Sequence, residues 1–315
     1  MLYSKSSSTG LSVSRFGLGT HYTIGDRLDL KQSQRILQEA LSIGINLIDT
    51  ANTYAEGECE QILGQLLKTV HHSQYLLATK LFFPIFDGPN GNGLSRKHII
   101  ESTHQSLKRL NVDYIDVLQM HRYDPDTPIE EVVETVRNLR YQGKILYWAV
   151  SQWSTKQLKA AIDLGERPIW NQLPFNYFYR KNTNLIIEMR KLGVDCLSYG
   201  ALAQGVINES YLNAGHSKGS RIFHRKAAQS LYHNIPSDLA TLKKLSECCN
   251  KRGISLFEFS VGFCELECDP VSTLIGSYRP IHFENMSKYI IEHSNIVTVI
   301  KEIVDELNLS SKSPT

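Results

Sequence analysis

The chain alternates short apolar runs with longer amphipathic segments, and this rhythm limits its possible folds more than any other feature. In 32–43, for example, apolar residues recur at helical spacing, and the apolar run 45–49 follows at once. Apolar strands that alternate with helices indicate a parallel sheet covered by helices. The predicted strands are 13–20, 45–49, 75–80, 114–120, 145–150, 169–173, 194–199 and 271–275, and the helices between the first seven are 32–43, 58–67, 96–110, 129–140, 155–164 and 184–192.

Eight such strands favour a closed barrel over an open sheet. The length of 315 residues allows either one large barrel or two smaller domains. A doubly wound dinucleotide-binding sheet is the alternative, but no Gly-x-Gly-x-x-Gly opens a helix after a strand. We therefore predict an α/β fold, a (β/α)8 TIM barrel with an N-terminal β-hairpin and extra helices near the C-terminus. It is expected to form one domain over 1–315, with 310–315 as a frayed tail.

Composition excludes several classes of protein. The 34 Lys+Arg and 32 Asp+Glu give a formal net charge of +2, which argues against nucleic-acid binding driven by charge. The N-terminus lacks the apolar core of a signal peptide, and no run is long enough to span a membrane, so we expect a cytoplasmic protein without membrane insertion. The six cysteines lack histidines at zinc-finger spacing, so buried thiols are expected and no metal site is predicted.

Polar residues stand where the predicted strands end, and in such barrels the active site is built at these carboxyl ends. Taken singly, Asp49 and Ser151 could be helix caps, Lys80 a solvated end and His121 a hydrogen-bonded core residue. Together they predict a functional site, because burying such a set is costly unless its members pair. The residues at the strand ends are Asp49, Lys80, His121, Ser151, Gln172, Tyr199 and Gly276.

Several motifs in order carry a family resemblance over roughly residues 10–305. The run 49–54, Asp-Thr-Ala-Asn-Thr-Tyr, with Gly-Glu-Cys-Glu at 57–60 and Leu-Gly at 63–64, resembles the signature of the aldo-keto reductase superfamily. The segments 93–101, 124–131 and 142–148 resemble the branch that holds the potassium-channel β subunits and bacterial aldehyde reductases. The resemblance implies an NADP(H)-dependent oxidoreductase that acts on an aldehyde, a ketone or the corresponding alcohol or sugar.

The resemblance also assigns a catalytic tetrad to Asp49, Tyr54, Lys80 and His121. Tyr54 is then the general acid/base of hydride transfer, and His121 binds the carbonyl oxygen. A Lys80 ammonium is expected to lower the pKa of Tyr54, with Asp49 holding Lys80 charged and oriented. The channel β subunits have asparagine at the position of His121, so the chain looks closer to the reductases.

Further residues are implied to bind the cofactor. Ser151 and Gln172 are expected to bind the nicotinamide carboxamide, Tyr199 to stack on the ring, 200–205 to wrap the pyrophosphate and 274–285 to hold the 2′-phosphate. Departures from the family pattern, among them a lost lysine at 209–211, leave NAD(H) open as an alternative. The implied cofactor-binding set is Thr20, Ser151, Gln152, Gln172, Tyr199, Gly200, Leu202, Gln204, Gly205, Arg221, Gly276, Ser277, Arg279, His282, Glu284 and Asn285.

Two functional hypotheses stay open at this point. The intact tetrad favours a carbonyl reductase with a small carbonyl or sugar substrate, acting as a monomer or homo-oligomer, with a tetramer suggested by the resemblance. The alternative is a cofactor-binding, redox-sensing regulatory subunit of a membrane or other partner. A sugar-phosphate isomerase is disfavoured, because no segment resembles its phosphate loop. An aromatic substrate lining is expected from His21, Tyr22, Phe82, Phe83, Tyr123, Phe175 and the loop 206–235.

Overall fold

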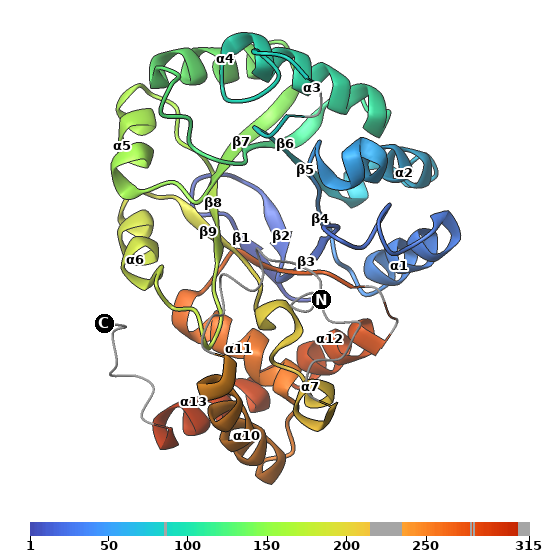
Figure 1. Cartoon of the computed structure of the whole chain (residues 1–315), viewed down its shortest axis with the longest axis vertical. Coiled ribbons are helices and arrows are strands. Elements are labelled where there is room, and N and C mark those ends of the chain that lie inside the picture. Colours follow the sequence, from blue (N-terminus) through green and yellow to red (C-terminus); the bar gives the residue numbers. More distant parts are fainter. Residues whose placement is uncertain (85–86, 215–234, 278, 280, 308–315) are drawn as a thin grey trace.

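A computed structural model describes residues 1–84, 87–214, 235–277, 279 and 281–307. Eight strands form a closed barrel in the order β10-β3-β4-β5-β6-β7-β8-β9, and every neighbouring pair is parallel (Figure 1). The predicted (β/α)8 barrel is therefore confirmed. The barrel strands are β3 (Phe16–Gly19), β4 (Leu47–Asp49), β5 (Leu76–Leu81), β6 (Ile115–Met120), β7 (Ile145–Ser151), β8 (Trp170–Pro174), β9 (Asp195–Tyr199) and β10 (Ser272–Ile275).

A helix follows each of the first six barrel strands, within two residues of its predicted range at either end. Side chains fix where several begin: Asp29 with Gln32, and Ser154 with Gln157, form reciprocal capping boxes that satisfy free backbone N–H groups. The six helices are α1 (Leu30–Ser42), α2 (Glu58–Leu67), α3 (Arg96–Leu110), α4 (Ile129–Tyr141), α5 (Thr155–Asp163) and α6 (Thr183–Lys191).

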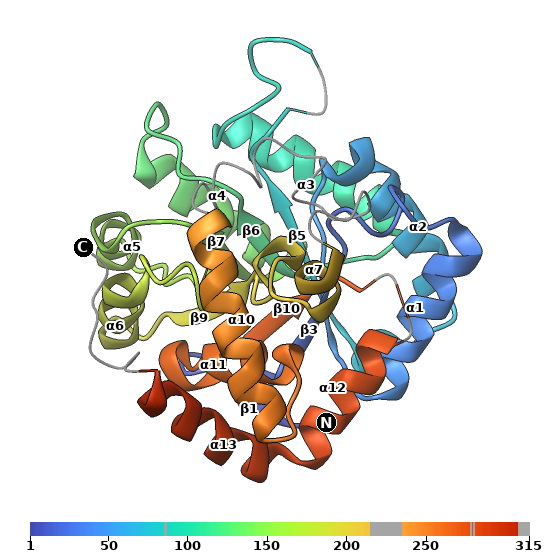
Figure 2. The same ribbon diagram turned by 60° about the horizontal axis from the view of Figure 1, so that its bottom comes forward.

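The predicted extra helices lie towards the C-terminus and gather on one side of the barrel (Figure 2). Within the described residues, no helix is long and apolar enough to cross a membrane. The additional helices are α7 (Glu209–Ala214), α10 (Ile235–Lys251), α11 (Leu256–Cys268), α12 (Ile281–Ile291) and α13 (His293–Glu306), and the short 3-10 turns are η1 (Tyr54–Gly57), η2 (His72–Gln74) and η3 (Ala203–Gly205).

The single strand predicted over 13–20 is wrong, because the chain bends at Arg15. The residues before the bend form β2 (Ser12–Ser14), which pairs antiparallel with β1 (Tyr3–Lys5) as the predicted N-terminal hairpin. The bend is held from both sides: the Arg15 N–H donates to Leu2 at 2.9 Å, and the Arg15 carbonyl accepts from Thr273 at 2.9 Å. An apolar run therefore supplied two strands of different sheets.

The hairpin closes the amino-terminal end of the barrel. Val13 of β2 is fully buried in an apolar cluster with inward side chains of the barrel strands. Gly17 of β3 allows close packing there, because a Cβ atom would approach the Leu274 side chain to 2.7 Å and force it to move. The cluster consists of Val13, Leu47, Ala78, Val117, Ala149, Ile169, Trp170, Leu197, Val271 and Leu274.

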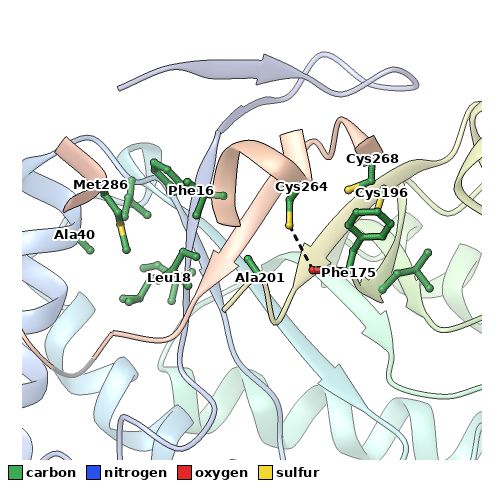
Figure 3. Packing of buried hydrophobic residues seen from close by; sticks show 14 of the residues in the cluster. Phe16, Leu18, Ala40, Phe175, Cys196, Ala201, Cys264, Cys268 and Met286 are labelled. Carbon is green, nitrogen blue, oxygen red and sulfur yellow. Dashed lines mark hydrogen bonds between the residues drawn. The ribbon is translucent and has the colours of Figure 1, made fainter. Parts of the chain in front are cut away.

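A larger apolar core lies between the barrel and its helices. Figure 3 shows Phe16 and Leu18 of β3 near Met286 of α12, and Cys196 of β9 near Cys268 of α11. All six cysteines are buried free thiols, as predicted, so this core is held by packing without disulfides.

Candidate active site

The four residues of the predicted tetrad come together at the carboxyl end of the barrel. Asp49 ends β4, Lys80 lies in the neighbouring β5, and His121 follows β6, which pairs with β5. Tyr54 begins the turn η1 after β4. Because parallel neighbours end at the same edge, the barrel places these side chains around one point although 72 positions (121 − 49) separate Asp49 from His121.

Lys80 is the centre of the group and is 1% exposed. Its Nζ donates to Asp49 Oδ2 at 2.6 Å, to the Thr50 carbonyl at 2.8 Å and to Tyr54 Oη at 3.2 Å, which uses all three ammonium protons. Burial lowers the pKa of Lys80, and the neighbouring Asp49 carboxylate counteracts that effect. The ion pair thus holds a cation against the phenol oxygen.

Asp49 is held in place by two amides. Gln119 Nε2 of β6 donates to Asp49 Oδ1 at 2.8 Å, and Gln172 Nε2 of β8 donates to Oδ2 at 3.4 Å. Gln119 is itself fixed by the Trp170 indole, which donates to its Oε1 at 2.9 Å. Gln119 was not among the residues predicted for the site, although a glutamine inside the apolar strand β6 is a signal of a buried polar network.

An unusual backbone positions Tyr54. Ala55, Glu56 and Gly57 all have positive φ (49°, 55° and 93°), so the chain turns sharply between Tyr54 and α2. Non-glycine residues in this conformation cost of order 1–3 kcal/mol each and cluster at functional sites. The turn presents the Tyr54 ring to the Lys80 ammonium, 4.9 Å from the ring centroid, and His21 stacks on the ring at 4.4 Å.

The pKa of Tyr54 lies well above its usual value, mainly because of burial and secondarily because of the Asp49 carboxylate. The expectation that Lys80 lowers this pKa is therefore wrong for the structure as it stands. A carboxylate beside the ammonium cancels much of its field, and desolvation penalises the phenolate. Tyr54 is thus a protonated phenol, which is the form that can donate a proton.

His121 is poised as a neutral hydrogen-bonding group. Its buried Nδ1 has no hydrogen-bond partner among the described residues. Its ring meets Tyr54 edge-on at 6.1 Å and Phe83 at 5.1 Å. Burial lowers the pKa of His121 well below the usual value, and the charges of Lys80 and Arg122 act in the same direction. A neutral imidazole beside the Tyr54 hydroxyl can donate a hydrogen bond to a carbonyl oxygen, while Tyr54 remains the group that transfers a proton to that oxygen.

The first group of predicted cofactor residues lines the same rim. Ser151 ends β7 and donates to the Gln172 carbonyl at 3.2 Å, and Thr20, after β3, donates to the Asp49 carbonyl at 3.0 Å. Gln152 has positive φ (59°), and its amide donates to Tyr199 Oη at 2.9 Å. That contact orients the Tyr199 ring, which suits a residue predicted to stack on a nicotinamide.

The second group lies on the loops after β9 and β10, which are neighbouring strands. In the first loop, Gly200, Gln204 and Gly205 have positive φ (73°, 59° and 94°), and η3 begins after Leu202. Asn176 donates to the Gly200 carbonyl at 2.9 Å and was not predicted. Small residues in a left-handed run let backbone groups approach a pyrophosphate, so this loop fits the predicted use.

The loop after β10 leads into α12, where a helix start favours anions. Ser277 Oγ donates to the Arg279 carbonyl at 3.2 Å and lies 3.3 Å from His282 Nδ1. Arg279 is exposed, and Gly276 opens the loop. Glu284 and Asn285 fall in the first turns of α12, whereas the predicted Arg221 lies outside the described residues.

The expected substrate lining is only partly correct. The Phe83 ring contacts the His121 ring, and His21 stacks on Tyr54, which itself contacts His121. Tyr123 packs edge-on against Trp153 at 5.1 Å. Phe175 is wrong as a lining residue. It is fully buried, stacks on Phe263 and belongs to the core between the barrel and α11. Its position directly after β8 predicted a place on the rim of the site, but its side chain packs outside the barrel against α11.

Comparison with known proteins agrees with this geometry. Residues 15–294 match the aldo/keto reductase family. The chain is 33% identical over 300 residues to a probable voltage-gated potassium channel subunit beta of Arabidopsis thaliana, covering 91% of this chain and 90% of the relative. Similar relatives occur in Oryza sativa subsp. japonica (31%, covering 98% and 95%) and Schizosaccharomyces pombe (30%, covering 95% and 89%), the latter named a putative channel subunit beta. The chain is a member of the aldo/keto reductase family, and so of a family of oxidoreductases.

Proposed function

We propose that this protein is an NADP(H)-dependent oxidoreductase that reduces an aldehyde or ketone, or oxidises the corresponding alcohol or sugar, with Tyr54 as general acid/base. The observation that carries the proposal is the position of the Lys80 ammonium, 2.6 Å from Asp49 and 3.2 Å from the Tyr54 hydroxyl, with His121 alongside. A buried chain of ionisable groups costs stability, so its presence indicates that the groups are kept for a function.

The residues of the site account for the proton in this reaction. NADPH, when bound, supplies the hydride that reaches the carbonyl carbon. Tyr54 and the neutral His121 hold the carbonyl oxygen, which polarises the double bond. As charge grows on that oxygen, Tyr54 donates its proton, and Lys80 stabilises the phenolate that remains. Asp49 keeps Lys80 charged throughout, and solvent returns the proton to Tyr54 after product release.

We propose NADP(H) as the cofactor, with NAD(H) as the alternative. Tyr199, oriented by Gln152, offers an aromatic face for a nicotinamide, and His121 Nδ1, which has no hydrogen-bond partner in the described part of the chain, lies on the same rim. The Arg279 guanidinium at the start of α12 supports a 2′-phosphate, because a guanidinium binds phosphate through paired hydrogen bonds. A monomer or homo-oligomer in the cytoplasm, acting on a small carbonyl or sugar, completes the proposal.

The competing function is that of a cofactor-binding subunit that reports redox state to a membrane or other partner. The names of the three relatives favour it, since all are described as potassium-channel subunits beta. The two proposals differ in turnover, because a sensor needs cofactor binding and an enzyme also needs a substrate.

The deciding experiment measures NADPH binding by protein fluorescence and NADPH oxidation across a panel of aldehydes, ketones, quinones and sugars. We expect binding together with oxidation that depends on both protein and carbonyl. Binding without oxidation of NADPH by any carbonyl of the panel contradicts the enzyme and favours the sensor.

A further inference from the structure

Arg122 stands directly after the catalytic His121, on the loop that leaves β6 at the carboxyl end of the barrel. Its guanidinium donates to the His121 carbonyl at 2.6 Å and lies over the Phe83 ring, 5.6 Å from the centroid. The Phe83 ring in turn meets the His121 ring edge-on at 5.1 Å. A fixed positive charge therefore sits beside the group predicted to bind the carbonyl oxygen.

This cation has no carboxylate partner among the residues that the structure describes. Other arginines near strand ends and helices pair with acids, as Arg109 does with Glu60 at 2.7 Å and Arg140 with Glu166 at 2.6 Å. A guanidinium has five N–H donors, and the contact with the His121 carbonyl uses one. Arg122 is only half-exposed, so a negative partner from outside the chain would repay its lost hydration.

The charge acts on the reacting groups. It acts with burial to lower the pKa of His121, and it opposes the stronger effect of burial, which raises the pKa of Tyr54 and of Tyr199. The geometry agrees, because the guanidinium lies over Phe83, whose ring contacts the His121 ring. An anion bound by Arg122 is therefore close to the carbonyl that Tyr54 protonates.

The position of Arg122 separates this anion from the cofactor phosphates. In the closed order of the eight strands, β6 stands opposite β10. The segments predicted to bind phosphate follow β9 and β10, on the far side of the barrel from Arg122. The charge on the β6 side is thus left for the substrate.

We propose that Arg122 binds a carboxylate or phosphate group of the substrate, so that the preferred substrates are aldehydes or ketones that carry a negative charge a few atoms from the carbonyl. Guanidinium recognises both anions through paired hydrogen bonds. Phe83 holds one face of the guanidinium and leaves its N–H edge for the ligand. This inference rests on the proposed carbonyl reduction and adds its substrate class.

The test compares matched charged and neutral substrates. For the carboxylate arm, kcat/KM with NADPH is measured for 4-carboxybenzaldehyde and for its methyl ester; for the phosphate arm, glyceraldehyde 3-phosphate is compared with glyceraldehyde. Wild type is set beside Arg122→Met, Arg122→Lys and the control Arg35→Met, an exposed arginine on α1 that pairs with Glu39. Equilibrium binding of each substrate to the NADPH complex is measured separately by fluorescence.

We expect the wild type to prefer the anionic member of at least one pair. Arg122→Met should lower that charged-to-neutral ratio about 10- to 100-fold, chiefly through KM, because it removes charge-assisted hydrogen bonds. Arg122→Lys should recover part of the ratio, and Arg35→Met should not change it. Added salt should weaken the preference.

The outcomes separate the two proposals. Equal kcat/KM for both members of each pair, or a ratio unchanged in Arg122→Met, overturns the role of Arg122 while leaving carbonyl reduction intact. Arg122-dependent binding of the anionic aldehyde without NADPH oxidation supports this site but contradicts the proposed reaction. If the protein neither binds nor turns over any anionic carbonyl, the inference is also overturned.

Discussion

The same strands build both ends of the barrel interior, with residues that lie only two positions apart in each strand. In β4, Leu47 belongs to the apolar inner cluster and Asp49 to the candidate site. Residues i and i+2 of a strand lie on one face, so both side chains point inward at different heights. The same step from an apolar to a polar residue recurs in the next five strands as Ala78 and Lys80, Val117 and Gln119, Ala149 and Ser151, Trp170 and Gln172, and Leu197 and Tyr199.

The inward face of the barrel is therefore divided into a lower, apolar layer and an upper, polar layer with different roles. The lower layer, closed by the hairpin, excludes water and contributes stability. The upper layer holds polar groups on that rigid base, where the strand ends fix their separation. Changes in the lower layer should therefore alter unfolding, and changes in the upper layer should alter turnover.

The largest effect on the upper layer is expected from Lys80→Met. Loss of the ammonium leaves Asp49 buried without a cation and removes the stabilising charge from Tyr54. We expect kcat to fall about 10²- to 10⁴-fold and the free energy of unfolding to fall by about 3–5 kcal/mol. Steady-state kinetics and denaturant unfolding measure both. Retention of more than a tenth of the turnover would contradict the role given to Lys80.

The matched change in the lower layer is Ile169→Ala. Ile169 is 4% exposed and precedes β8 at the closed end. Removing its side chain should cost about 2–5 kcal/mol of stability through lost burial and a cavity, while kcat of the folded protein stays within about twofold. A large loss of kcat with unchanged stability would show that the layers are not separate.

The sequence predicted a residue's place in the site best where that place depends only on its position at the end of a strand. Asp49, Lys80 and His121 could be predicted to share one rim because each stands at the end of a predicted strand, and parallel strands end at the same edge of the barrel. The assignment of these three and Tyr54 as a tetrad came from the family resemblance. Gln119 was missed because it lies within its strand and not after the strand end. It could have been predicted as an inward-facing polar residue, because it follows the inward-facing Val117 by two positions. Phe175 was misplaced because only tertiary packing against Phe263 turns it into the core.

The bend at Arg15 and the pKa of Tyr54 lay beyond the sequence for other reasons. The segment 13–20 carries no mark of the long-range backbone hydrogen bonds to Leu2 and Thr273 that divide it at Arg15. The pKa depends on the sum of burial and of charges from several strands, and that sum requires coordinates.

The pH dependence of reduction follows from the upper layer. The pKa of Tyr54 lies well above its usual value of 10.0, and that of His121 lies well below its usual value of 6.5. Between these values Tyr54 stays protonated and His121 neutral, so kcat for aldehyde reduction should be nearly flat. It should fall above this range as Tyr54 loses its proton, and below it as His121 gains one. A midpoint near pH 8 in kcat would contradict this assignment.

The smallest effect concerns cofactor choice. Arg279→Ala should weaken NADPH binding about tenfold relative to NADH, because a single charge-assisted contact to the 2′-phosphate is lost. Dissociation constants for both cofactors in wild type and variant test this. An unchanged ratio would remove Arg279 from the phosphate site without affecting the tetrad.

We propose that Tyr54 supplies the proton while the rest of the upper layer stays intact, and Tyr54→Phe is the decisive variant. The variant deletes one hydroxyl and keeps the ring that contacts His21 and His121. Single-turnover NADPH oxidation with an aldehyde is measured alongside the NADPH dissociation constant. We predict a loss of about 10²- to 10⁴-fold in the rate with cofactor affinity within about twofold of wild type. Oxidation at the wild-type rate would show that another group protonates the carbonyl oxygen.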